Sequence, residues 1–272
     1  MSSTTKSVPR QALEVLRRDG PRVLLDRARR RIANRIAPIV YVPYWRYRYG
    51  VIEECGRQAA LSSERPVFND LFANLDSSDV FYDVGAYTGL YTGAMASFLP
   101  PGQVVAFEPG EAVAELETYL QRHDLEAIVV PKALSQRAGD GYHSHEDRLG
   151  LLGNTDEDGS LPATSAQEII ADGELPFPTV VKIDVFGAEL DAVRGLEELL
   201  ERDECRLVYC ELHLPTTFQR KRPDHIFEEY LNEWSFTEIV RVLYRCGFEV
   251  DPMFLRDDTH DLFIKAYKPE QS

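Results

Sequence analysis

The sequence predicts an α/β protein built on a mostly parallel β-sheet. Between about residues 79 and 212, short apolar runs alternate with helical stretches, as in consecutive β–α–β units. A glycine-rich turn directly follows the first of these strands. Near the C-terminus, two strands joined by a short polar connection predict an antiparallel hairpin on the sheet edge. With 272 residues, the chain can bury one substantial core and still carry an appendage.

Apolar runs bounded by turn residues set the expected elements. The predicted strands cover about residues 80–84, 103–108, 127–130, 180–185, 206–212, 248–250 and 261–267. The predicted helices cover about residues 90–99, 111–122, 188–201 and 236–245. A segment rich in Gly, Asp and His, residues 138–163, is expected to be a loop.

Residues 1–75 are expected to form a basic helical extension that precedes the sheet domain of residues 76–272. Apolar residues recur near helical spacing from Arg10 to Ile36, and an arginine-rich face lies between them. Two interpretations stay open. The segment is either a helical cap docked on the acidic domain, or an amphipathic helix that contacts an anionic membrane surface peripherally, followed by the aromatic residues of 41–47.

The charge is distributed unevenly along the chain, whose formal net charge is −15. Residues 1–50 hold 12 Lys or Arg and 3 Asp or Glu, whereas the rest holds 18 basic and 42 acidic residues. Such an acidic body repels phosphates, so we expect no nucleic-acid partner for the main domain. Abundant carboxylates with only 6 Lys among the 30 basic residues suggest a halophile-like, high-salt cytoplasm.

Other global features also favour a cytoplasmic protein. No apolar run approaches the length of about 18–20 residues that a membrane span needs. The N-terminus lacks the apolar segment and small-residue cleavage site of an export signal. The four dispersed cysteines are expected to be reduced thiols.

The first motif is the run DVGAYTG from Asp83 to Gly89, between a strand and a helix. The glycines let the backbone turn tightly and approach a ligand closely, so Gly85, Ala86, Tyr87 and Gly89 are candidate cofactor-binding residues. Asp83 stands where a dinucleotide fingerprint has its first glycine. A carboxylate there would repel a pyrophosphate, but it can accept hydrogen bonds from the amino group of a methionine moiety. The motif therefore favours S-adenosylmethionine over NAD.

Glu108 ends the second predicted strand, within Ala106-Phe107-Glu108-Pro109. An acidic residue about 20 positions beyond the glycine turn is placed to accept hydrogen bonds from ribose hydroxyls. The alternative is an exposed charge at a strand end.

Two further pairs of polar residues end predicted strands. Lys182 and Asp184 share one face of their strand, as do Glu211 and His213 of the next, because residues i and i+2 point the same way. Buried ionisable groups are costly unless they are paired or used, and a structural Lys–Asp pair is one outcome. Asp184, Glu211 and His213 are the candidate catalytic residues, with Asp184 also near the cofactor. They can form a base or a divalent-metal site, but the sequence assigns no metal.

The runs DVGAYTGLYT, VVAFEP, VVKIDVFGAELDAVRG and VYCELH together resemble the FkbM family of methyltransferases, over roughly residues 65–268. This resemblance implies a Rossmann-like, seven-stranded methyltransferase sheet with S-adenosylmethionine bound around Gly85, Glu108 and Ser135. It also implies O-methylation of sugars or natural products. One position departs from the family, because Phe186 stands where members usually carry Glu. This departure weakens any metal proposal and suggests an altered acceptor pocket.

The predicted function is therefore S-adenosylmethionine-dependent O-methylation of a hydroxyl on a sugar, a glycan or a related small metabolite. The acceptor pocket is expected to form from residues 138–163 and 214–226. Arg220, Lys221 and Arg222, in the second of these segments, are candidates for recognising an acidic sugar or a phosphate-linked carrier.

Three alternatives remain at this point. A methyltransferase acting on amino groups of nucleic-acid bases would usually carry an Asn/Asp-Pro-Pro-Tyr-like loop where this chain has Asp184-Val-Phe-Gly187. A Rossmann nucleotide-sugar oxidoreductase would need the pyrophosphate turn that Asp83 disfavours. A non-catalytic cofactor-binding partner in a membrane-associated glycan pathway would bind cofactor without turnover. The oligomeric state is not predicted.

Overall fold

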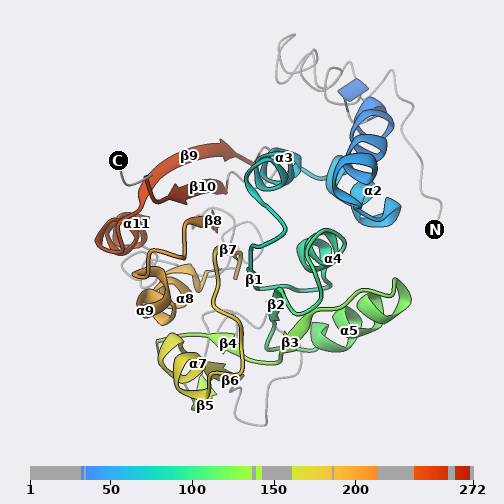
Figure 1. Ribbon diagram of the computed structural model, residues 1–272. Coiled ribbons are helices and arrows are strands. Elements are labelled where there is room, and N and C mark those ends of the chain that lie inside the picture. Colours follow the sequence, from blue (N-terminus) through green and yellow to red (C-terminus); the bar gives the residue numbers. More distant parts are fainter. Residues whose placement is uncertain are drawn as a thin grey trace, which may run out of the picture.

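The computed structural model describes residues 32–33, 35–136, 139–142, 161–185, 187–213, 236–256 and 261–269. Its centre is a seven-stranded sheet in the order β3-β2-β1-β7-β8-β10-β9 (Figure 1). The strands are β1 (Phe81–Val84), β2 (Val104–Phe107), β3 (Ile128–Val130), β7 (Val180–Ile183), β8 (Leu207–Leu212), β9 (Glu249–Leu255) and β10 (Leu262–Tyr267).

The direction of the strands confirms the predicted fold class. Strands β3, β2, β1, β7 and β8 run parallel, whereas β10 is antiparallel to both of its neighbours, β8 and β9. The C-terminal strands therefore close the sheet as the expected antiparallel hairpin. Because the chain reverses the order of the strands beside β1, the carboxyl ends of β1 and β7 form a topological switch point, where open α/β sheets bind their ligands.

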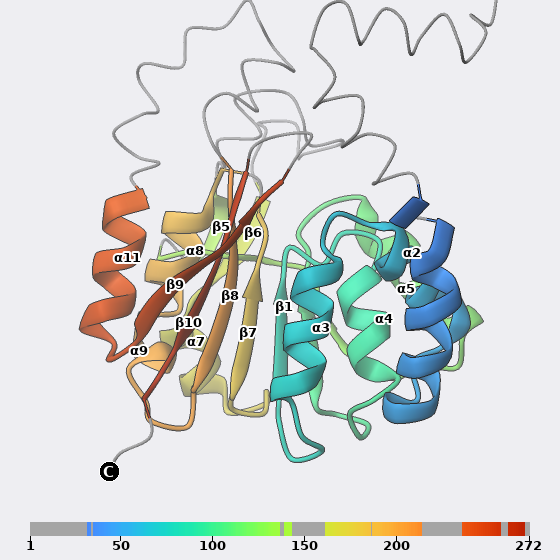
Figure 2. The same cartoon turned by 90° about the horizontal axis from the view of Figure 1, so that it is seen from above.

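Helices cover both faces of this sheet (Figure 2). One side carries α2 (Glu53–Leu61), α3 (Arg65–Asn74) and α4 (Leu90–Ala96), with α5 (Ala112–Arg122) near β2 and β3. The other side carries α7 (Ala166–Asp172), α8 (Glu189–Gly195), α9 (Glu197–Leu200) and α11 (Phe236–Arg245). A hydrophobic core lies on each face of the sheet, and successive strand residues point into opposite cores because side chains along a strand alternate. Phe81 packs with α3 and α4, and Tyr82 packs with α7 to α11.

The structure differs from the sequence prediction within residues 138–163. Strands β5 (Gly139–Tyr142) and β6 (Leu161–Thr164) pair with β4 (Ala133–Leu134) in a small second sheet of order β4-β6-β5. These strands are short and contain Gly, Asp and Pro, so they lack the apolar run that predicts a strand. Residues 143–160 of the predicted loop lie outside the described residues.

Helix α7 was also missed, although its start carries a local signal. The Ser165 side chain accepts a hydrogen bond from the Glu168 backbone amide at 3.4 Å. This Ser-x-x-Glu pattern is that of a helix N-terminal capping box. The predicted helix over residues 188–201 is in fact two short helices, α8 and α9.

Part of the predicted N-terminal extension packs against the sheet domain. Residues 35–49 are helical, and Trp45 is fully buried there, with ring centroids 6.2 Å from Phe68 and 5.8 Å from Phe72 of α3. The arginine-rich residues 10–31 lie outside the described residues, and the domain boundary near residue 75 stays a prediction. Within the described part of the chain, no helix is long and apolar enough to cross a membrane.

Truncating Trp45 tests whether this helix belongs to the cooperative unit. We expect Trp45→Ala to lower the free energy of unfolding by about 3–5 kcal/mol, because a large buried aromatic side chain leaves a cavity. Tyr47→Ala is the matched control, since that side chain is 91% exposed and its loss should change stability by about 0.5 kcal/mol or less. Urea unfolding followed by circular dichroism provides the measurement. An unchanged main transition in Trp45→Ala would mean that the helix unfolds independently of the sheet.

Candidate functional site

Five polar residues meet on one face of the sheet, at the carboxyl ends of β1, β7 and β8. Asp83 lies directly opposite Lys182 in the β1–β7 register, and Asp184 follows β7. Glu211 and His213 lie at the end of β8, on the next strand. Their strand positions alternate with those of the α8-side core, so their side chains lie on the face covered by α3 and α4.

The turn after β1 is possible only with glycine at its first position. Gly85 has φ +81°, and a Cβ atom there would lie 2.0 Å from the carbonyl oxygen of Asp184. Gly89 has φ +93°, and its Cβ would lie 2.6 Å from the Leu116 side chain. The amide of Ala86 donates to the Phe107 carbonyl at 3.1 Å, which joins the turn to the end of β2. The backbone is therefore packed tightly against both neighbouring strands.

Glu108 is tied to this turn through the backbone. Its Oε2 accepts a hydrogen bond from the Tyr87 amide at 2.8 Å, and its Oε1 accepts one from the Gly110 amide at 3.3 Å. Burial raises the pKa of the Glu108 carboxyl, and these two hydrogen bonds oppose that rise. The Tyr87 side chain itself is exposed, and its φ of +48° is unusual for a residue with a Cβ.

A buried charge cluster lies beneath the turn. The Lys182 ammonium is 3.5 Å from Oδ1 of Asp83 and 3.2 Å from Oδ2 of Asp184, and it lies 4.4 Å from the ring centroid of Tyr91. Oδ2 of Asp83 accepts a hydrogen bond from the Thr92 hydroxyl at 2.6 Å. Burial alone would lower the pKa of Lys182, but Asp184 and Asp83 together raise it above its ordinary value. Lys182 thus stays charged and neutralises the carboxylates beside it.

His213 is held between two carboxylates. Its Nδ1 lies 2.7 Å from Oε1 of Glu189, and its Nε2 lies 3.8 Å from Oδ1 of Asp184. The Glu189 carboxylate also accepts a hydrogen bond from the Gly187 amide at 2.8 Å. Glu189 was not among the residues that the sequence singled out, because an acidic residue at a helix start is ordinary. Its burial beside His213 is visible only in the structure.

The electrostatics of this cluster raise two pKa values. Burial would lower the pKa of His213, but the hydrogen bond to Glu189 and the charges of Glu189, Asp184 and Glu211 raise it to about 9. Burial, and then the charge of Asp184, raise the pKa of Glu211 to about 8. Arg256, which follows β9, donates to Oε1 of Glu211 at 2.7 Å. Oε2 of Glu211 is buried and has no hydrogen-bond partner among the described residues.

These side chains also resemble a metal-ligand set. One potential ligand atom each from Asp184, Glu211 and His213 lies within 4.8 Å of the others. Carboxylate and imidazole donors suit several divalent cations. However, Lys182 and Arg256 already pair with the two carboxylates, and their positive charge opposes the binding of another cation.

The other predicted site residues are distributed differently. Ser135 is buried after β4, where its hydroxyl bonds to Asp191 of α8 at 2.9 Å and its amide donates to the Thr164 carbonyl at 2.9 Å. Its part in cofactor binding stays a prediction. Outside the described residues lie Phe186, the candidate acceptor residues Arg220, Lys221 and Arg222, and the unplaced part of residues 138–163.

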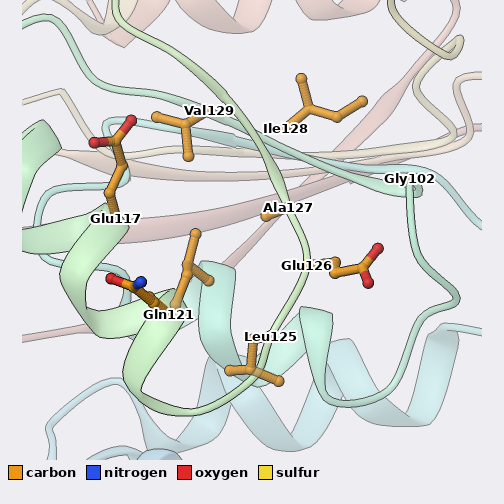
Figure 3. Close-up of a pocket in the computed structure, with 9 residues that line it drawn as sticks. Gly102, Glu117, Gln121, Leu125, Glu126, Ala127, Ile128 and Val129 are labelled. Carbon is orange, nitrogen blue, oxygen red and sulfur yellow. The ribbon is translucent and has the colours of Figure 1, made fainter.

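A separate hollow of about 560 Å³ lies beside α5 and β3 (Figure 3). Glu117 and Gln121 of α5 line it together with Gly102 and residues 125–129. Gly102 precedes β2 and residue 125 precedes β3, so the hollow lies toward the amino ends of these strands. This is the end opposite the charge cluster, and ligands of open α/β sheets bind at the carboxyl ends.

The motifs around this site match a known family. The domain described as Methyltransferase FkbM domain matches residues 83–250, which is more than half of the chain. The chain belongs to the FkbM methyltransferase family. The match begins at Asp83 and includes Glu108, Lys182, Asp184, Glu211 and His213.

This FkbM methyltransferase is similar to a curated protein and to several solved structures. The hexuronic acid methyltransferase AglP of Haloferax volcanii is 27% identical over 172 residues, which cover 62% of this chain and 70% of that protein. Methyltransferase FkbM from Methylobacillus flagellatus aligns over 89% of this chain and 60% of its own, with 15% identity and a TM-score of 0.49. Magnesium protoporphyrin IX methyltransferase from Synechocystis, solved with bound SAM, aligns over 88% and 97%, with 13% identity and a TM-score of 0.43.

Two glycine substitutions test the tight turn of this FkbM methyltransferase. Gly85 and Gly102 both have positive φ, but a Cβ at Gly102 would meet nothing within 4 Å. We expect Gly102→Ala to lower the free energy of unfolding by about 1 kcal/mol, because only the positive-φ backbone conformation is unfavourable for alanine there. Gly85→Ala should cost several times more, because its Cβ overlaps the Asp184 carbonyl. Thermal unfolding of the two purified variants compares these costs. Equal melting temperatures would show that β1 and β7 are not packed this closely.

Proposed function

We propose that this protein is an S-adenosylmethionine-dependent O-methyltransferase whose acceptor is a hydroxyl of a sugar, a glycan or a related small metabolite. One observation carries the proposal: the glycine turn and Glu108 lie at the same sheet edge as the cluster of half-buried Asp184 with buried Glu211 and His213. A cofactor held by the first group would place its reactive end near the second. The AglP relative is named for a hexuronic acid, which favours an acidic sugar as the acceptor class.

The chemistry of the described residues fits the cofactor. Each carboxylate oxygen of Glu108 accepts one hydrogen bond from a backbone amide, and the remaining lone pairs can accept hydrogen bonds from both ribose hydroxyls. Oδ1 of Asp83 lies 3.5 Å from the Lys182 ammonium but accepts no hydrogen bond among the described residues, so it can still act as an acceptor near the turn. When bound, S-adenosylmethionine supplies a methyl group activated by a positively charged sulfur.

The alternative functions are less well supported. A nucleotide-sugar oxidoreductase would place a pyrophosphate at the turn above Asp83, where a fully buried carboxylate would repel it. A non-catalytic cofactor-binding partner would have no use for the His213–Glu189 pair, whose two buried side chains are costly to maintain. A divalent cation at Asp184, Glu211 and His213 is the second candidate for the chemistry of the site, and it can be tested directly.

The residues at the edge can supply a base for the acceptor hydroxyl. Glu189 accepts a hydrogen bond from Nδ1 of His213, and this bond fixes the ring and turns Nε2 toward Asp184, whose Oδ1 lies 3.8 Å away. A proton taken by Nε2 gives an imidazolium between Glu189 and Asp184, whose negative charges stabilise it. We therefore assign His213 as the general base and Glu189 as its positioning residue. Such a base contributes about 10²–10⁴-fold to the rate.

Cofactor binding provides the first test. Isothermal titration with S-adenosylhomocysteine should show binding, whereas NADH should not bind. Glu108→Ala should weaken the binding of S-adenosylhomocysteine by about 10- to 100-fold, since hydrogen bonds to a charged group contribute about 1.5–3 kcal/mol. Glu111→Ala is the control, because it removes a nearby exposed carboxylate. Preferential binding of NADH would refute the methyltransferase proposal.

The pH dependence of methyl transfer tests the base. A base has to be unprotonated, so a pKa of about 9 for His213 predicts that kcat/KM rises with pH and levels off above about pH 9. Glu211 titrates in the same range, and the rising limb therefore belongs to the coupled pair. His213→Gln should lower kcat by about 100-fold or more, and Glu189→Gln should shift the limb to lower pH because it removes a negative charge. Radiolabelled methyl transfer to hexuronic acids and their glycosides provides the assay.

His123→Gln is the control for this experiment, because His123 lies at the C-terminal end of α5, outside the cluster, and pairs with Glu54 of α2. It should leave both kcat and the pH limb unchanged. If EDTA abolishes the activity and Mg²⁺ or Mn²⁺ restores it, the cluster is a metal site and His213 is not the base.

The cellular setting is part of the same proposal. We expect a cytoplasmic, halophile-like enzyme whose basic N-terminal segment contacts the inner membrane surface peripherally. The composition supports this expectation, through the excess of basic residues within positions 1–50 and the acidic remainder.

A further inference from the structure

The helix of residues 35–49 has two apolar faces, of which the sheet domain uses one. Ala37, Val42 and Trp45 are buried against the body of the protein. The opposite face stays exposed, although it is equally apolar. Its large apolar side chains, which we call the N-terminal stripe, are Ile36 (50% exposed), Ile39 (74%), Val40 (54%), Tyr44 (51%) and Tyr47 (91%).

The stripe is continuous and bordered by arginines. At 3.6 residues per turn, its members fall within about 140° of the helix circumference. By the same geometry, Arg35 and Arg46 border one side of the stripe and Arg48 borders the other, and all three are exposed. An apolar face with interfacial tyrosines and flanking arginines is the pattern of a helix that lies in the plane of a membrane interface.

The charge of the chain favours an anionic surface as the partner. Residues 1–50 hold 12 basic and 3 acidic residues, whereas the remaining chain holds 18 basic and 42 acidic residues. An anionic bilayer attracts the first group and repels the second, so the protein would bind with this helix toward the lipid. The helix lies at the periphery of the molecule in both views, away from α7 and α11 (Figures 1 and 2).

A second copy of the chain fits the stripe less well. The stripe of another copy would bring Arg35, Arg46 and Arg48 of both chains together, and these like charges would repel one another. Among the described residues, the acidic body of another copy exposes only scattered large apolar side chains that could cover the isoleucines, namely Leu61, Tyr87, Ile170, Phe236, Tyr244 and Leu255. Lipid acyl chains cover apolar side chains, while the headgroups contact the arginines.

We propose that the N-terminal stripe docks this protein on an anionic lipid surface, with the helix of residues 35–49 lying in the membrane interface. It rests on the peripheral membrane contact proposed above, for which it names the helix face, and it does not depend on the methyltransferase activity. Docking would keep the enzyme beside acceptors carried in the membrane.

Vesicle binding by the full chain tests the proposal. The stripe variant is the double substitution Ile39→Ser and Tyr47→Ser. Its matched control is Ile170→Ser with Tyr244→Ser, which removes one exposed isoleucine and one exposed tyrosine from α7 and α11. Flotation measures binding to phosphatidylglycerol vesicles and to phosphatidylcholine vesicles, at low and at high salt. Binding of S-adenosylhomocysteine and the melting temperature show that each variant is folded.

We expect the unmodified chain to float with phosphatidylglycerol vesicles and less with phosphatidylcholine. The stripe variant should bind phosphatidylglycerol vesicles at least about tenfold more weakly than the unmodified chain, because two interfacial apolar side chains are lost. The control should bind like the unmodified chain. Three results would overturn the proposal. One is no flotation of the unmodified chain, and another is equal loss in both variants. In the third, the stripe variant floats like the unmodified chain but has half its particle mass in light scattering. That result would assign the stripe to contact with a second copy.

Discussion

The buried contact between Lys182 and the two carboxylates of Asp83 and Asp184 determines how the site is built. The three charges lie on adjacent strands β1 and β7, with Asp83 and Lys182 directly opposite each other. Any shift of one residue in the register would turn Lys182 toward the apolar core of α8 and leave both carboxylates unpaired. Breaking a buried pair of this kind costs about 3–5 kcal/mol. The charge cluster therefore specifies the register that also brings Gly85 against the Asp184 carbonyl.

The same register explains why the proposed cofactor-binding and base residues lie side by side. Glu108 reaches the glycine turn through the Tyr87 amide, so the ends of β1 and β2 are fixed together. Asp184 reaches His213 on the other side, at the end of β8. One row of strand ends thus carries the proposed cofactor-binding groups at one side and the proposed proton-accepting groups at the other. In a methyltransferase this arrangement brings the transferred group to the acceptor, and alignment of that kind is the main contribution a protein can make to an already activated methyl group.

The sequence predicted the groups whose signal is local, and it missed those whose signal is not. The strand positions, the C-terminal hairpin, the glycine turn and the pairs Lys182–Asp184 and Glu211–His213 follow from periodicity and motif order, whereas the order of the strands in the sheet is seen only in the structure. Glu189 was missed because its contact with His213 joins residues 24 positions apart. Arg256 was missed because it meets Glu211 across 45 positions, through the hairpin that returns β10 beside β8. The short strands β5 and β6 were not predicted for a different reason, since they gain their stability from pairing rather than from apolar composition.

Helix α3 joins the surface of the N-terminal helix to the site. Its Phe68 and Phe72 pack on Trp45, and Glu64 at its start lies 3.7 Å from Arg256. Arg256 in turn donates to Glu211. A chain of packed contacts therefore runs from the helix of residues 35–49 to the base cluster, and it holds the exposed stripe at a fixed position relative to the sheet edge. Because packed interiors deform little, a protein docked through that stripe would present its site to the membrane in one orientation rather than many. Because Trp45 anchors the helix on α3, the outer face of the same helix keeps a fixed orientation relative to the site.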